Sequence, residues 1–165
     1  MVEEGVDHFE RTGESEQERL NRNMNELLQE LRVSQTGVQI LFAFLLAVPF
    51  AQRFNEVTAF QRDVYFVTLL LAALASAFFI APVSFHRLLF RRQEKAYLIT
   101  TSNWMAISGL VCVALAITGV ILLITAFLFS ATAAVAVTAV SALIFGYLWF
   151  APPLLRLRRQ WRRDS

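Results

Sequence analysis

Charged side chains are almost missing from most of this chain. No Asp, Glu, Lys or Arg occurs in residues 33–52, 64–86 or 96–155, and only 17% of the 165 residues are charged. Soluble domains carry about 25% charged residues spread over their length. The distribution therefore excludes an ordinary soluble domain. It also disfavours ion-coupled pumps and antiporters, which generally keep an ionisable group near the membrane midplane.

Cysteine and histidine are equally scarce. Cys112 is the one cysteine, so an intramolecular disulfide and a CxxC metal site are both excluded. His8 and His86 have no nucleophile or metal-ligand partner at helical spacing. We therefore expect no enzyme, no metal and no cofactor. The first apolar run follows an acidic lead rather than a basic one, so no cleaved signal peptide is expected.

Apolar residues are abundant: they make up 56% of the chain, and the mean hydropathy is +0.51. Four apolar runs reach the roughly 20 residues that a helix needs to cross a bilayer. The runs are continuous rather than alternating, which excludes a β-barrel. The sequence thus predicts an all-α integral membrane four-helix bundle. Its spans are about 34–52, 64–85, 104–129 and 131–155, within a transmembrane domain of residues 34–155.

The basic residues predict the orientation of these spans. Thirteen of the fifteen Lys and Arg residues precede the first span, lie between the second and third, or follow the fourth. By the positive-inside rule both termini are cytoplasmic, and residues 156–165 form a basic cytoplasmic tail. Because these basic residues lie beside apolar spans rather than on a soluble face, nucleic-acid binding is not expected. They favour anionic lipid headgroups, and the headgroup-facing candidates are Arg87, Arg91, Arg92, Arg156, Arg158 and Arg159.

The region before the first span has two parts. Residues 1–14 are acidic and poor in large apolar groups, which predicts disorder. Residues 15–33 predict an amphipathic helix, cytoplasmic or interfacial, in which Arg22 pairs with Glu18 and Glu26. This helix has three alternatives: it lies on the membrane, packs under the bundle, or forms a coiled coil with a second copy. Its apolar face comprises Leu20, Met24, Leu27, Leu28 and Leu31.

Several signals mark the ends of the spans. Residues 128–132 must turn the chain, so the third and fourth spans form a tight antiparallel hairpin. Ser102 or Asn103 is a candidate cap for the third span, and Pro49 is a candidate bend near the end of the first. An aromatic-x-Ala-Pro sequence ends both the second and the fourth span. This repetition indicates either a duplicated hairpin or the common suitability of proline at a helix exit.

Polar residues inside the spans are the main functional candidates. Gln35, Thr36 and Gln39 lie in the first span, and the two amides are one helical turn apart. They either line a narrow polar path or form hydrogen bonds between packed helices, of which the second is the commoner use. The fourth span adds small residues at four-residue intervals, a spacing that lets helices approach closely. These are Ser130, Ala134, Thr138, Ala142 and Gly146.

His86 lies at the inner end of the second span, beside Arg87. Its side chain titrates in the physiological range, so it is a candidate for a pH-sensitive group. The neighbouring Arg91 and Arg92 favour an interfacial histidine instead.

The run ELLQELRVSQTGVQILFAFLLAVPF, together with FIAPVSFHRLLFRR, resembles a family of small four-span membrane proteins of unknown function from actinobacteria. The likeness covers about Glu26 to Leu128. It implies the plasma (inner) membrane of a bacterium. Some relatives are labelled sodium:proton antiporters, a label that the missing midspan carboxylate disfavours. The residues that match the motif are Gln35, Thr36, Gly37, Gln39, Pro82, His86 and Arg87.

Together these observations predict a multi-pass membrane protein that acts as a non-enzymatic interaction or accessory module. Four short-looped helices leave much surface, so a homo-oligomer is expected, with an unidentified membrane protein as a further partner. The alternative is a small oligomeric ion transporter or channel with its path near Gln35 and Gln39. The solute, if there is one, and the copy number are not encoded in any pattern of this sequence.

Overall fold

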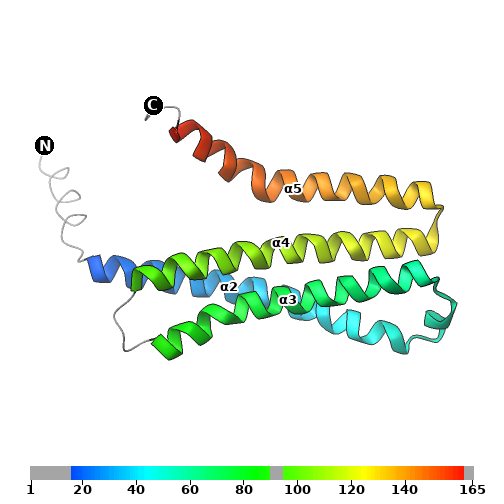
Figure 1. Cartoon of the computed structure of the whole chain (residues 1–165), viewed down its shortest axis with the longest axis horizontal. Coiled ribbons are helices and arrows are strands. Elements are labelled where there is room, and N and C mark those ends of the chain that lie inside the picture. The colour runs from blue at the N-terminus through cyan, green and yellow to red at the C-terminus, as the bar shows by residue number, and fades with distance from the viewer. Residues whose placement is uncertain (1–15, 90–94, 162–165) are drawn as a thin grey trace, which may run out of the picture.

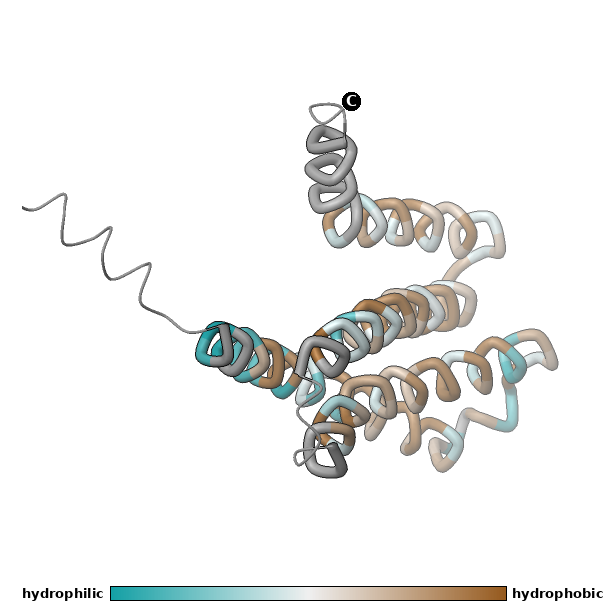
Figure 2. The backbone as a smooth tube through the Cα atoms, turned by 60° about the vertical axis from the view of Figure 1, so that its left-hand side comes forward, coloured by the Kyte–Doolittle hydropathy of each residue, from teal (hydrophilic) through white to brown (hydrophobic). Residues whose placement is uncertain are grey.

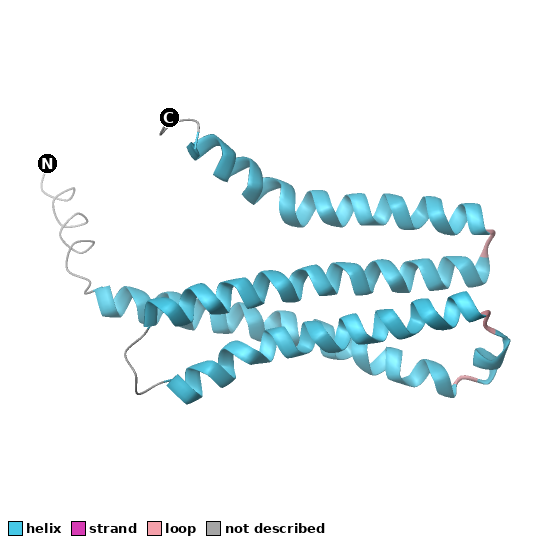
Figure 3. Ribbon diagram, viewed as in Figure 1, coloured by secondary structure: helices cyan, strands magenta, loops and turns pink. Residues whose placement is uncertain are grey.

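The computed structural model describes residues 16–89 and 95–161, and these residues form helices joined by short turns (Figure 3). The expected disordered segment, residues 1–14, lies outside the described residues. No strand occurs in the described ranges. The prediction of an all-α fold with four long apolar helices is confirmed. The elements are α2 (Glu16–Ala47), the 3-10 turns η1 (Val48–Phe50) and η2 (Gln52–Glu56), α3 (Ala59–Leu89), α4 (Lys95–Leu128) and α5 (Ala131–Trp161).

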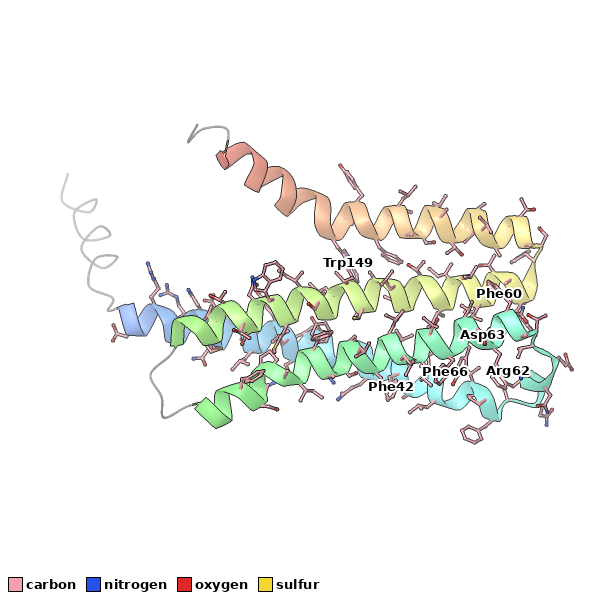
Figure 4. All side chains as sticks on the ribbon, in the orientation of Figure 1. Phe42, Phe60, Arg62, Asp63, Phe66 and Trp149 are labelled. Atoms are coloured by element: carbon pink, nitrogen blue, oxygen red, sulfur yellow. The ribbon has the colours of Figure 1, made fainter. Side chains whose placement is uncertain are left out.

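All four α-helices are long and apolar enough to cross a membrane. The apolar segments are Arg22–Phe50, Ala59–Phe85, Ile99–Leu128 and Ala131–Trp149. The helices run alternately in opposite directions, so the start of α2 and the end of α5 lie at the same end of the molecule (Figure 1). Charged Arg62 and Asp63 lie at the other end, in the first turns of α3 (Figure 4).

The amphipathic segment and the first span are one helix. α2 continues without a break from Glu16 to Ala47, 32 residues or about 48 Å, and its hydrophilic start gives way to a hydrophobic second half (Figure 2). Arg22 pairs with Glu26 across one turn at 3.9 Å, as the spacing predicts. Near Pro49, which lacks an N–H, the α-helix gives way to the 3-10 turns.

The core lies between α2, α3 and α4, and each helix contributes residues at heptad-like spacing, as packed helices do. α2 contributes large residues at intervals of seven, whereas α4 contributes small ones. The buried positions are Met24, Leu31, Val38 and Leu45 of α2; Tyr65, Thr68, Ala72, Ala75, Phe79 and Pro82 of α3; and Ser102, Gly109, Ala116 and Thr125 of α4. Small residues on α4 allow α3 to approach it closely.

Two glycines of α4 occupy the points of closest approach to α3. A Cβ at Gly109 would overlap the Phe79 ring, whose Cδ1 lies 2.7 Å from that position. A Cβ at Gly119 would overlap the hydroxyl of Thr68 and lie 3.2 Å from its Cβ. Both neighbours are buried. The glycines are therefore required by space rather than by backbone conformation.

α5 is the peripheral helix of the fold. Two residues, Phe129 and Ser130, connect it to α4, which confirms the predicted hairpin. In the described part of the chain α5 packs on α4 and makes no close approach to α2 or α3 (Figure 1). Trp149 points toward α4 (Figure 4), with its ring centroid 5.7 Å from that of Phe145. α3 thus sits between two helices and α5 beside one, so the two aromatic-x-Ala-Pro helices occupy unlike positions.

Only the first part of the predicted small-residue stripe of α5 packs against α4. Ala134 is buried against α4, but Ala142 and Gly146 are exposed, and nothing lies within 4 Å of a Cβ added at Gly146. The stripe drifts away from α4 because residues four apart do not repeat on one face of a 3.6-residue helix.

Side chains join the helix ends where α2 and α4 finish and α3 begins. Thr58 and Gln61 form a reciprocal capping box: Gln61 N donates to Thr58 Oγ1 (3.2 Å), and Thr58 N donates to Gln61 Oε1 (2.9 Å). Gln61 Nε2 also donates to the carbonyl of Ala126 (3.3 Å), and the Tyr65 hydroxyl donates to the carbonyl of Leu45 (2.9 Å). Both carbonyls belong to last turns, which leave acceptors unsatisfied.

The start of α4 corrects one expectation. α4 begins at Lys95, so a cap at Ser102 or Asn103 is wrong. Ser102 is instead buried inside the helix, where a small side chain fits against its neighbours. The sequence misleads because the residues before Trp104 are polar although they are helical.

Candidate functional site

The three polar candidates of the first span all lie on one side of α2, at different depths from the core. Gln35 is half-buried, whereas Thr36 and Gln39 are exposed. Arg32, a turn before them, is exposed as well. Gln39 therefore lies on the outside of the bundle rather than between its helices, so a single chain does not enclose it.

Five hydroxyls in the spans form a hydrogen bond within their own helix. Thr36 Oγ1 donates to the carbonyl of Arg32 at 3.0 Å, one turn back. Four further hydroxyls make the same bond to the residue four positions earlier, at 2.7–2.8 Å; they belong to Thr68, Thr118, Thr125 and Ser141. A hydroxyl bonded in this way needs neither a solute nor a second helix.

Three buried oxygen atoms have no hydrogen-bond partner in the described part of the chain. They are Gln35 Oε1, Ser76 Oγ and Thr138 Oγ1. An unpaired buried polar atom costs about 1–3 kcal/mol. Gln35 differs from Thr36 and Gln39, because its Oε1 is buried and has no hydrogen-bond partner among the described residues.

A polar stripe on α2 extends beyond the three predicted residues. Its members are spaced alternately by four and three residues, so they share one face of the helix, and all six are exposed. We call this stripe the polar flank; it consists of Asn25, Gln29, Arg32, Thr36, Gln39 and Ala43. In the sequence, the alternation of four and three residues between successive polar side chains is the signal that identifies this face.

The polar flank enters the apolar part of the helix. The segment Arg22–Phe50 is long and apolar enough to span. Gln39 lies seven residues, or about 10 Å, beyond Arg32 and ten residues, or about 15 Å, before Pro49. In a hydrocarbon layer about 30 Å thick, its amide would be well below the surface.

Comparison with known proteins supplies a family and no activity. A family model described as a family of unknown function, DUF6328, matches residues 13–153. The chain belongs to the DUF6328 family. No curated protein and no solved structure matches it. The predicted resemblance to an uncharacterised family is thereby confirmed, and neither source organism nor transport activity comes with it.

In this DUF6328 protein the remaining candidates lie at the helix ends. His86 and Arg87 belong to the last turn of α3, and their side chains lie outside the described residues. The same holds for the side chains of Arg156, Arg158 and Arg159, near the end of α5. Arg91 and Arg92 are in the undescribed segment 90–94. Their roles at the headgroups, and that of His86, stay predictions.

No group of three or more His, Cys, Asp and Glu that could hold a metal occurs among residues 16–89 and 95–161 of the DUF6328 chain. Cys112 is partly buried beside the cluster of Leu31, Val38, Ala75 and Phe79. It therefore contributes apolar packing to the core.

The unpaired amide of Gln35 gives a testable prediction. Gln35→Met keeps the length of the side chain and removes the buried acceptor, so we expect the free energy of unfolding to rise by about 1 kcal/mol. Unfolding in micelles with increasing SDS, followed by tryptophan fluorescence, measures the change. Gln39→Met, at an exposed amide, is the matched control and should leave monomer stability within about 0.5 kcal/mol. Destabilisation by Gln35→Met would mean that the amide has a partner.

Proposed function

We propose that this chain is a multi-pass protein of a bacterial cell membrane that acts as a non-enzymatic interaction module and associates with further copies of itself through the polar flank of α2. Both termini face the cytoplasm in this proposal, because the basic residues gather on that side. The observation that carries the proposal is the exposed Gln39 within an apolar span.

Leaving this amide in lipid is unfavourable. An amide moved into an apolar medium without a hydrogen bond costs about 2–7 kcal/mol. Thr36 avoids this cost by bonding to Arg32, but a glutamine amide has two donors and an acceptor to satisfy. A partner that supplies hydrogen bonds at the depth of Gln39 would remove the penalty.

A second copy of the chain suits this role. An amide is both donor and acceptor, so two Gln39 side chains can bond to each other across a two-fold axis, where each surface meets its own equivalent. The alternation of four and three residues is the spacing of a helix-pairing seam, and polar residues within a seam set the register and number of the paired helices. Thr36 and Ala43 are small enough to let the helices approach closely.

The other end of the span favours association over transport. Beyond Gln39 the next residues on this side are Ala43 and Leu46, both apolar. A pore formed along the polar flank would therefore lose its polar lining in the outer half of the membrane.

Liposomes that contain the protein should accordingly show no flux of protons, sodium, potassium or chloride above that of empty vesicles. Flux that is abolished by Gln39→Leu would favour the transporter alternative.

Self-association is tested by the dimerisation constant of Gln39→Leu in liposomes, measured by energy transfer between labelled copies. Interhelical hydrogen bonds contribute up to about 1–2 kcal/mol, so we expect the dissociation constant to rise about fivefold to thirtyfold. Gln39→Asn keeps the amide and should retain most of the association. Gln52→Leu removes an exposed amide outside the α-helices and should change nothing. Unchanged association of Gln39→Leu, or a monomeric wild type, would overturn the proposal.

A further inference from the structure

An apolar pocket of about 490 Å³ lies at the end of the bundle where α2 and α4 finish and α3 begins. Its inner wall comes from all three core helices and from the 3-10 turns. The wall includes Leu41 and Leu45 of α2, Phe54 of η2, and Val120 and Leu123 of α4. Its volume falls in the range of about 300–1,000 Å³ that is typical of ligand pockets.

The polar groups at this pocket are already engaged. The lining residues Gln61 and Tyr65 are its polar side chains. Gln61 bonds to Thr58 and to the carbonyl of Ala126, and the Tyr65 hydroxyl bonds to the carbonyl of Leu45. Ordered water needs two to four polar partners to occupy a cavity, and here the side chains offer little bonding capacity. The chemistry of the wall selects an occupant without polar groups.

The rim of the pocket includes exposed apolar residues of α2 and α4. Phe44 of α2 and Ile124 and Phe127 of α4 line it and remain exposed, at 71%, 55% and 44% of their surface. These residues belong to segments apolar enough to span a membrane. Part of the pocket's rim thus belongs to the surface that would face lipid tails.

We propose that this pocket binds one acyl chain of a bilayer lipid, inserted laterally between α2 and α4. The headgroup stays outside, because the pocket holds no charged side chain that could receive it. The acyl chain gains van der Waals contacts with Leu, Val and Phe side chains. Such contacts are the main attraction between apolar groups within a membrane. The site rests on the membrane residence of the proposed function, but not on self-association.

The test uses the full chain in vesicles of phosphatidylglycerol and phosphatidylethanolamine that carry a trace of lipid with a photoreactive diazirine on the acyl chain. After illumination, mass spectrometry maps the labelled residues. We expect label on Leu45, which is 4% exposed, and on Leu123, in addition to residues on the outer surface. A diazirine placed on the headgroup should leave both residues unlabelled. Label confined to exposed residues outside the pocket, such as Phe66 and Leu143, would overturn the proposal.

A variant that fills the pocket gives an independent reading. Leu123→Trp should reduce labelling of Leu45 about tenfold, equivalent to about 1.4 kcal/mol of lost binding. Leu143→Trp, on the exposed side of α5, should not reduce it. Equal labelling in both variants would contradict the site. The map of the wild type stands on its own if Leu123→Trp fails to fold.

Failure of the pocket and failure of the proposed function give different results. Flotation of the vesicles separates inserted protein from protein that stays behind. Inserted protein without label at Leu45 overturns the acyl-chain site alone. Label at Leu45 with no energy transfer between copies overturns self-association alone. Protein that does not float with vesicles overturns membrane residence and the acyl-chain site together.

Discussion

Phe79→Ala is expected to lower the free energy of unfolding by about 3–5 kcal/mol, the usual cost of truncating a buried aromatic side chain. Phe79 is 2% exposed and lies in the cluster with Leu31, Val38 and Ala75, against Gly109 of α4. The ring therefore lies in a cluster to which all three core helices contribute. The loss is large because truncation removes the van der Waals contacts of the whole ring, and such contacts drive the association of helices in lipid.

Unfolding in micelles by SDS measures this effect, and Phe66→Ala is the matched control. Phe66 lies on the same helix but is 56% exposed, so its truncation should change stability by less than about 1 kcal/mol. Similar losses at both positions would show that Phe79 does not have the central place that the structure gives it.

Gly109→Ala is expected to destabilise the fold by about 1–3 kcal/mol, the usual cost of overpacking a core. The added methyl would overlap the Phe79 ring, and that buried ring has little room to move. Alanine is otherwise the better helix former by about 1 kcal/mol, so the expected sign depends on the contact alone. The same unfolding measurement applies.

Gly37→Ala is the control for this prediction. Nothing lies within 4 Å of a Cβ at Gly37 on α2, so the same change should stabilise the protein by about 0.5–1 kcal/mol. The double variant with Phe79→Ala and Gly109→Ala tests the contact directly. Its loss should be smaller than the sum of the two single losses, because the new methyl occupies the space of the removed ring. Additive losses would place the two residues out of contact.

Hydropathy predicts the number of helices and the hairpin between the last two, because a long uncharged run has few other structures available in a bilayer. It does not predict which face of each helix is inside. α4 is apolar all round, so the burial of Gly109 and Ala116 has no counterpart in its hydrophobic pattern. The close approach of α3 to α4 emerges only in three dimensions.

The candidate site could be predicted only in part, because the burial of each residue depends on where the other helices lie. Gln35 and Gln39 were visible as amides one turn apart, but their different burial follows from where α3 and α4 lie. The capping box of Thr58 and Gln61 has the readable form T-x-x-Q, but it lies between two apolar runs, where hydropathy carries no signal. The apolar pocket has no linear signature, since its wall comes from separate helices and turns.

Because α5 packs on α4 alone, stability is not expected to be uniform over the four helices. α2, α3 and α4 enclose a core between them, whereas α5 packs on α4 alone among the described helices. Segments that pack on fewer neighbours tend to open locally before the rest of a fold, so we expect amide exchange to be faster in α5 than in the other three helices. In that case α5 would detach and return while α2, α3 and α4 stay folded.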